Sequence, residues 1–96
     1  MSDLLLTPAA RADLSDIWAY TADRWGIDQA ETYIRAIMAT CTALADARAQ
    51  SRPADHIRPG LRKIASGRHM IYLRGTSPVT ILRILHQRMD VDAHFT

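Results

Sequence analysis

Apolar residues recur every three or four positions through the first part of the chain, which is the spacing of one face of a helix. This pattern extends over residues 8–25 and predicts a first helix there. Thr7 suits the N-cap, and Pro8 suits the first helical position, where the missing N–H of proline costs nothing. Gly26 follows directly and suits the C-terminal end of this helix.

A second helix is predicted immediately afterwards, because the same spacing continues through residues 30–44. Asp28 and Glu31 resemble a capping box with Asp in place of Ser or Thr, so we expect the helix to start there. The pattern fades near Arg48. The connection between the two helices is very short, and we therefore expect an antiparallel helical hairpin.

Four short apolar runs predict β-strands. Turn residues such as Ser66-Gly67 separate the later runs, which is typical of hairpins. The expected strands are Leu4–Leu6, Leu61–Ala65, His69–Arg74 and Val79–His86. The last strand is apolar at nearly every position, so we expect it to be central and covered on both faces, whereas the first should pair at one edge.

The order of these elements predicts one α+β domain over residues 1–96. A chain of this length forms a single core. The strands must form one sheet, and the two helices must cover one face of it. We expect a two-layer β-αα-βββ fold, with the helical hairpin packed on a mainly antiparallel sheet. The tail Met89–Thr96 could add one helical turn begun by Asp90.

Trp18 and Trp25 are seven residues apart on the predicted apolar face of the first helix. That spacing favours core positions for both. The alternative is a docking groove for an apolar helix of a partner, where aromatic side chains provide a large contact area.

Charge is distributed unevenly along the chain. The total is 12 Lys+Arg against 10 Asp+Glu, a net charge of +2. Residues 1–50 hold seven acidic and four basic side chains, giving −3, and residues 51–96 hold three acidic and eight basic side chains, giving +5. This asymmetry suggests two surfaces with different partners. The small total argues against strong nonspecific binding to DNA, and we expect no direct specific binding of nucleic acid.

Several features predict a cytoplasmic protein. The single cysteine, Cys41, cannot form an internal disulfide, which favours a reducing compartment. No apolar run approaches the roughly 18–20 residues of a membrane span. The start Met1-Ser2-Asp3 lacks the basic region of a signal peptide.

The predicted strands place cations on the sheet. By strict alternation, Tyr72 and Arg74 share one side of their strand, and Arg83 shares a side with Ile81 in the last strand. If the helices cover the side of Leu82, Arg83 lies on an open concave face, and the opposite facing stays possible. Such a face could bind RNA phosphates, receive an acidic peptide, or be an ordinary solvated surface.

The residues provide no clear catalytic or metal centre. His86, His94 and Asp90 match no tight ligand spacing, and Cys41 lies on the apolar face of the second helix. Neither a phosphate-binding loop nor a dinucleotide fingerprint is present. We therefore predict no cofactor, no metal and no catalytic nucleophile.

Several segments together carry a resemblance to a known family. They are Leu6-Thr7-Pro8-Ala9-Ala10, Asp13-Leu14-Ser15-Asp16-Ile17-Trp18-Ala19-Tyr20, Arg24-Trp25-Gly26 with Ala30 and Tyr33, Arg58-Pro59-Gly60-Leu61-Arg62, Ser66-Gly67-Arg68-His69 with Ile71-Tyr72, and Ile84-Leu85-His86-Gln87-Arg88-Met89-Asp90. In this order and over nearly the whole chain, they resemble ParE-type toxins of the ParE/RelE superfamily.

The resemblance implies a function and two partners. Such proteins are toxins of bacterial type II toxin–antitoxin modules with the β-αα-βββ layout. A ParD-type antitoxin binds them with a C-terminal segment that folds on the toxin, and a heterotetramer or larger assembly is expected. Members of the ParE branch inhibit DNA gyrase, whereas the RelE branch cuts mRNA on the ribosome.

The C-terminal residues favour the ParE branch. RelE-type catalysis relies on Lys and Arg on the sheet and on a Tyr near the C-terminus. Here the stretch after Arg88 contains no Tyr, only Phe95, which has no ionisable group. We expect a non-enzymatic gyrase inhibitor. The alternatives are a ribosome-dependent endoribonuclease and a diverged member that binds its antitoxin without toxicity. The residues that such a ribonuclease would use are Lys63, Arg68, Arg83 and His86.

The resemblance and the charge layout together give the candidate binding residues. For the target we expect Arg68, Tyr72, Arg83, His86 and Arg88. For an acidic, amphipathic antitoxin segment we expect Leu14, Trp18, Arg62, Arg68, Arg74 and Arg83.

Overall fold

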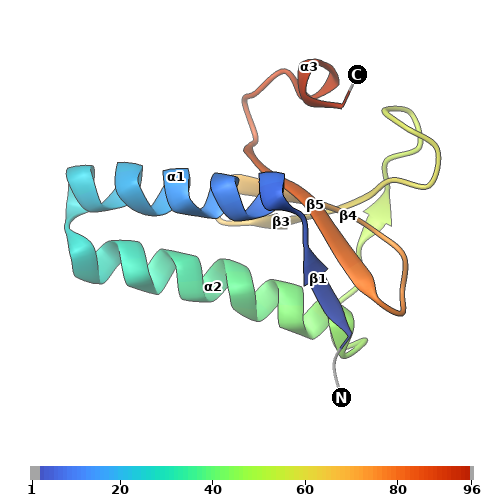
Figure 1. The fold of residues 1–96 in the computed structure, drawn as a ribbon, viewed down its shortest axis with the longest axis horizontal. Coiled ribbons are helices and arrows are strands. Elements are labelled where there is room, and N and C mark those ends of the chain that lie inside the picture. Colours follow the sequence, from blue (N-terminus) through green and yellow to red (C-terminus); the bar gives the residue numbers. More distant parts are fainter. Residues whose placement is uncertain (1–2, 96) are drawn as a thin grey trace.

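The chain folds into a helical hairpin packed on one face of a five-stranded sheet (Figure 1). A computed structural model describes residues 3–95. Its elements are β1 Leu4–Leu6, α1 Pro8–Trp25, α2 Ile27–Ala45, β2 Arg52–Pro53, β3 Arg62–Ser66, β4 His69–Arg74, β5 Val79–His86 and α3 Val91–His94. The strand order is β1-β5-β4-β3-β2, in which only β1 and β5 pair in parallel. The predicted α+β fold, with an edge position for the first strand, is confirmed.

The boundaries of α1 agree with the sequence prediction, whereas those of α2 differ from it. Thr7 caps α1 by accepting a hydrogen bond from the backbone N–H of Ala10 at 3.0 Å. The predicted capping box at Asp28 and Glu31 is wrong, because α2 already begins at Ile27 with no side-chain cap, and it ends at Ala45. Gly26, with φ of +93°, reverses the chain in a single residue and leaves no room for a separate cap.

The β3–β4 turn lies one residue later than predicted, at Gly67-Arg68. Gly67 has φ of +58°, and a Cβ built there would lie 2.7 Å from the hydroxyl oxygen of Tyr33. Both the backbone angle and the close approach of Tyr33 therefore require glycine. This turn brings the hairpin against α2. The two-residue strand β2 is not among the strands expected from the sequence.

The larger core lies between the sheet and the helices. It contains Ile17 from α1, Ile37 and Cys41 from α2, and Ile71 and Ile81 from the sheet. Burial raises the pKa of the Cys41 thiol to about 11, so the thiol stays protonated and unreactive. The predicted core role of Cys41 is confirmed.

A β-bulge in β5 changes which residues face the helices. Leu73 pairs with Ile81 while Tyr72 pairs with Arg83, so Leu82 is an extra residue in the ladder. As a result Ile81 and Ile84 both belong to the helix-covered core. The prediction of strict alternation is wrong here, and Arg83 lies opposite Tyr72 on the other face.

That other face carries a second, smaller core. Tyr72 and Leu85 are buried there together with Ala54 and Leu61. The segment between β2 and β3 and the C-terminal tail cover them, and Phe95 of the tail packs on this cluster. Because β5 contributes to both clusters, the predicted covering of its two faces is confirmed.

The two tryptophans are not core residues, contrary to the favoured prediction. The buried residues of α1 are Ala10, Ile17 and Thr21, whereas Trp18 is 37% and Trp25 is 59% exposed. The far half of the helical hairpin extends beyond the edge of the sheet (Figure 1), so the apolar face of α1 continues past the core. Over residues 3–95 we find no helix that is both long and apolar enough to cross a bilayer.

Candidate functional site

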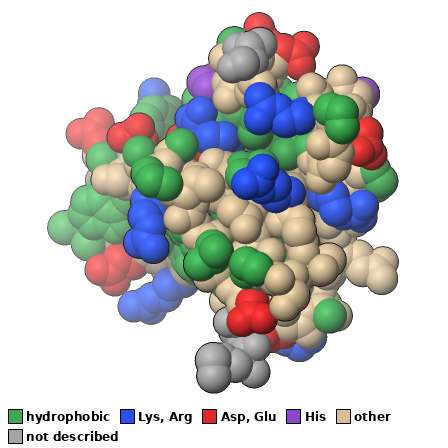
Figure 2. Space-filling view, turned by 45° about the vertical axis from the view of Figure 1, so that its right-hand side comes forward, with side chains coloured by type: hydrophobic (Ala, Val, Ile, Leu, Met, Phe, Trp, Pro, Cys, Tyr) green, Lys and Arg blue, Asp and Glu red, His purple; other side chains and the backbone are tan. Residues whose placement is uncertain are grey.

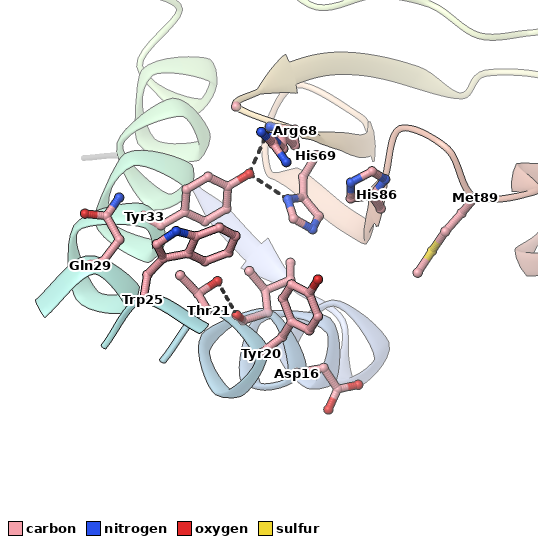
Figure 3. A pocket seen from close by; sticks show the side chains of 12 residues that line it. Asp16, Tyr20, Thr21, Trp25, Gln29, Tyr33, Arg68, His69, His86 and Met89 are labelled. Carbon is pink, nitrogen blue, oxygen red and sulfur yellow. Dashed lines mark hydrogen bonds between the residues drawn. The ribbon is translucent and has the colours of Figure 1, made fainter. Parts of the chain in front are cut away.

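A groove opens where the helical hairpin extends past the sheet. It has a volume of about 790 Å³ and lies between α1, α2, the β3–β4 turn and the end of β5 (Figure 3). We call it the aromatic groove and define it by Tyr20, Trp25, Tyr33, His69, His86 and Met89. Asp16 from α1 and Arg68 from the β3–β4 turn add one charge of each sign to its lining.

Tyr33 joins the two sides of the aromatic groove. Its hydroxyl oxygen accepts a hydrogen bond from the backbone N–H of Arg68 at 2.9 Å and lies 2.7 Å from Nδ1 of His69 (Figure 3). The phenolic O–H can therefore donate to Nδ1, which assigns the proton of a neutral His69 to Nε2. This pair fixes the imidazole of His69 at the floor of the groove.

His69 and His86 face each other across β4 and β5. The two residues pair directly in the ladder, and their ring centres are 5.4 Å apart in an edge-on arrangement. Burial lowers the pKa of His69, and the charge of His86 lowers it further, while Asp13 has the opposite effect. The neutral form of His69 is thus favoured, in agreement with its acceptor role towards Tyr33.

The opening of the groove is bordered by large apolar side chains that face solvent. Tyr20 is 58%, Trp25 is 59% and Met89 is 47% exposed. Ile27, at the junction of the helices, is 59% exposed as well. Contiguous exposed aromatic and apolar side chains mark surfaces that bind other molecules.

Asp13 and Arg83 form a clasp between α1 and the exposed edge of β5. Nε and Nη2 of Arg83 donate to the two carboxylate oxygens of Asp13, each at 2.8 Å. The backbone N–H of Ile84 donates to the same carboxylate at 2.9 Å. Hydrogen bonding by Asp13 raises the pKa of Arg83. The clasp satisfies an edge N–H that β1 is too short to reach, and it ties Arg83 to the fold.

The five residues expected to bind the target do not form one surface. Arg68 and His86 line the aromatic groove, and Arg88 is exposed just beyond β5. Tyr72 is only 4% exposed and lies under Phe95, with ring centres 5.2 Å apart. Arg83 belongs to the clasp with Asp13.

The residues expected to bind an antitoxin are also dispersed. Leu14 packs against the helix-covered core, and Trp18 is partly exposed on α1. Arg62 donates to the side chain and backbone oxygens of Ser51 at 2.7 and 2.6 Å. Arg68 and Arg74 are exposed, and of this group Arg68 alone lines the groove.

Sequence reasoning missed Tyr33 and His69 as site residues, and Asp13 as the partner of Arg83. A signal existed for His69, because antiparallel pairing of the strands 69–74 and 79–86 brings the start of the first, His69, beside the end of the second, His86. Tyr33 lies on the apolar face of α2, which made it resemble a core residue. In the part of the chain that the structure describes, no three metal-ligating side chains come together.

Comparison with known proteins gives consistent matches. Residues 4–91 match the family described as the ParE toxin of the type II toxin–antitoxin system parDE. The chain is 46% identical over 93 residues to toxin ParE1 of Mycobacterium tuberculosis, covering 95% of both chains. It is 40% identical over 94 residues to toxin ParE1 of Caulobacter vibrioides, covering 98% of both.

A solved structure of the chromosomal ParDE TA system from P. aeruginosa has the same fold. It superposes with a TM-score of 0.76 and covers 90% of this chain and 96% of that chain, at 24% identity. At that identity the likeness supports the fold alone, whereas the sequence matches span nearly the full length of both partners. This chain therefore belongs to the ParE toxin family of type II toxin–antitoxin systems.

Proposed function

We propose that this chain inhibits a gyrase-type topoisomerase by binding to it, and that a ParD-like antitoxin neutralises it. The observation that carries the proposal is the near full-length match to ParE toxins. Gyrase acts on the chromosome, so the proposal places the protein in the cytoplasm. The groove and the exposed basic residues are the surfaces available for the two partners.

The aromatic groove supports binding of an amphipathic antitoxin segment. Its exposed Trp25 and Tyr20 provide apolar contact area, and Arg68 provides a cation for a carboxylate. The solved relative with the same fold is named as a ParDE system. Dimeric DNA-binding antitoxins would give a heterotetramer or a larger assembly.

The two tryptophans of α1 provide a matched test of antitoxin binding. Trp25 lines the groove, whereas Trp18 does not. Trp25→Ala should weaken the antitoxin complex by about 30-fold or more, the effect of a buried aromatic anchor. Trp18→Ala should weaken it less. Equal affinity of both variants and the original chain would contradict a groove-centred complex, and insensitivity to salt would contradict a role for Arg68.

The arrangement of the sheet favours inhibition by binding over ribonuclease catalysis. Lys63 and Arg83 both pair with Tyr72 and so lie on one face, whereas His86 lies on the helix-covered face beside His69. A base and the cations that stabilise a cleavage transition state must reach one phosphate. The residues of the ribonuclease alternative are thus divided between the two faces.

Expression of the chain without its antitoxin tests the proposal in cells. We expect growth arrest with a DNA-damage response and intact mRNA. In-frame cuts in ribosome-bound mRNA that Arg83→Ala abolishes would instead favour the ribonuclease. Harmless expression of folded protein would identify a member that has lost toxicity.

A further inference from the structure

A second hollow, of about 480 Å³, lies on the face of the sheet opposite the helices. Arg58, Arg74, Arg83 and His94 line it, and none of its lining residues is acidic. We call it the arginine pocket. Figure 2 shows Lys and Arg side chains gathered below the C-terminal segment, with hydrophobic side chains between them.

The guanidinium groups of the pocket are only partly used within the chain. Arg83 directs Nε and Nη2 to Asp13, while its Nη1 lies 3.5 Å from Nδ1 of His94. Arg58 donates through Nη2 to the backbone oxygen of Phe95 and stacks over the ring of Phe95 at 5.7 Å. Arg74 is exposed and has no hydrogen bond or ion pair with any side chain in residues 3–95. Donors from all three arginines thus remain for a ligand.

The pocket also has an apolar wall. Leu82 and Pro59 line it together with Phe95. The ring of Phe95 also packs edge-on against Tyr72. A volume of 480 Å³ lies within the range of roughly 300–1,000 Å³ that is typical of small-molecule sites. The space therefore exceeds the needs of a single small ion, and an aromatic or apolar group can accompany the anion.

We propose that the arginine pocket binds a phosphate ester of about the size of a mononucleotide. The three arginines come from β4, from β5 and from the segment between β2 and β3, so their donors approach from different elements. A tetrahedral phosphate can accept hydrogen bonds in several directions at once, whereas a planar carboxylate suits one or two arginines. The base or sugar of the ester packs on Phe95 and Pro59.

This inference is independent of the proposed function, because its readout is direct binding of a small molecule rather than toxicity. The phosphate could belong to a free nucleotide or to the backbone of a single strand. Both sources present the same chemistry to the arginines, and the experiment separates them.

Calorimetric titration of the purified full chain tests the proposal. The probes are adenosine monophosphate, inorganic phosphate and a short oligothymidylate at low ionic strength. The variants are Arg74→Gln, which removes an exposed side chain without a partner in the fold, and Arg58→Gln. The control is Arg35→Gln on α2, which changes the net charge equally at a side chain that is 80% exposed and far from the pocket.

We expect adenosine monophosphate to bind, and Arg74→Gln and Arg58→Gln each to weaken it about tenfold or more, as for a lost charged hydrogen bond. Arg35→Gln should have no effect. Oligothymidylate binding at least tenfold more tightly than the mononucleotide would identify a strand backbone as the source, and comparable affinities would identify a free ester. Absence of binding, or equal weakening by Arg35→Gln, would overturn the proposal.

Discussion

The two faces of the sheet are covered by different kinds of structure. On one face, two long helices and the sheet enclose a core of ten buried residues. On the other, a loop and a short tail cover a cluster of four buried residues. Long regular elements thus form the first cover, and largely irregular segments form the second.

This difference indicates which region stabilises the fold and which regions are available for binding. The helix-covered face contains the largest fully buried side chains of the helices and of β4, and it holds the fold together. The aromatic groove and the arginine pocket both lie where this packing ends, beyond the edge of the sheet and beneath the tail. Side chains can remain exposed there because neighbouring elements do not reach them.

Truncation of one core residue on each face tests the comparison directly, and the change on the helix-covered face should give the largest effect of all. Ile71→Ala, on the helix-covered face, should lower the free energy of unfolding by about 4 kcal/mol. Leu61→Ala, on the opposite face, should lower it by about 2 kcal/mol, because the loop above it can collapse into the space. Urea denaturation measures both values. Equal losses would show that the thin cover packs as rigidly as the helices.

Breaking the clasp between Asp13 and Arg83 should have the next largest effect. Asp13→Ala leaves a partly buried guanidinium and the edge N–H of Ile84 without their acceptor, which should cost about 3 kcal/mol of stability. Asp16→Ala, one turn away and exposed, is the matched control and should change stability by less than about 0.5 kcal/mol. If both variants lose the same amount, the clasp has no special role.

The tail should contribute less. Phe95→Ala removes the edge-on contact with Tyr72 and the stacking partner of Arg58, at a cost of about 1 kcal/mol. Hydrogen exchange should accelerate in β4 near Tyr72 while the helices stay protected. Unchanged exchange in β4 would mean that the tail does not shield this face.

The same regions show how much of the fold could be predicted from the sequence. Periodicity located α1 and the strands, because core packing follows the apolar spacing there. It misplaced Trp18 and Trp25, since spacing alone does not reveal where a helix passes the end of the sheet. It also placed Arg83 on the same side of the last strand as Ile81, whereas the bulge at Leu82 puts these two residues on opposite faces.

The candidate site was harder to predict for the same physical reason. The aromatic groove joins residues from both helices, the β3–β4 turn and the end of β5, which only the tertiary arrangement brings together. The link from Tyr33 to His69 spans 36 positions in the sequence. Arg68 and His86, which resemblance and charge indicated, do lie in that groove.

The smallest expected effect is a pH dependence that originates in the groove. Because the pKa of His69 is lowered in the folded state, the unfolded chain binds more protons as the pH falls below about 6.5. The contribution of His69 to the free energy of unfolding is therefore complete above that pH, and it is lost as the pH falls through the pKa of His69 in the folded state.

Replacement of His69 isolates this contribution. Between about pH 7.5 and about pH 5, His69→Gln should lose less stability than the original chain. His56→Gln, an exposed position in the loop before β3, is the control for loss of a histidine. Identical acid sensitivity of His69→Gln and the original chain would contradict the partly buried, neutral state of His69.

Inhibition of purified gyrase tests the central claim most directly. The full chain, free of antitoxin, is titrated into a DNA supercoiling reaction. The account predicts a saturable loss of supercoiling together with accumulation of cleaved DNA bound to the enzyme. Undiminished supercoiling without cleaved complexes, at a large excess of folded chain over gyrase, would contradict it.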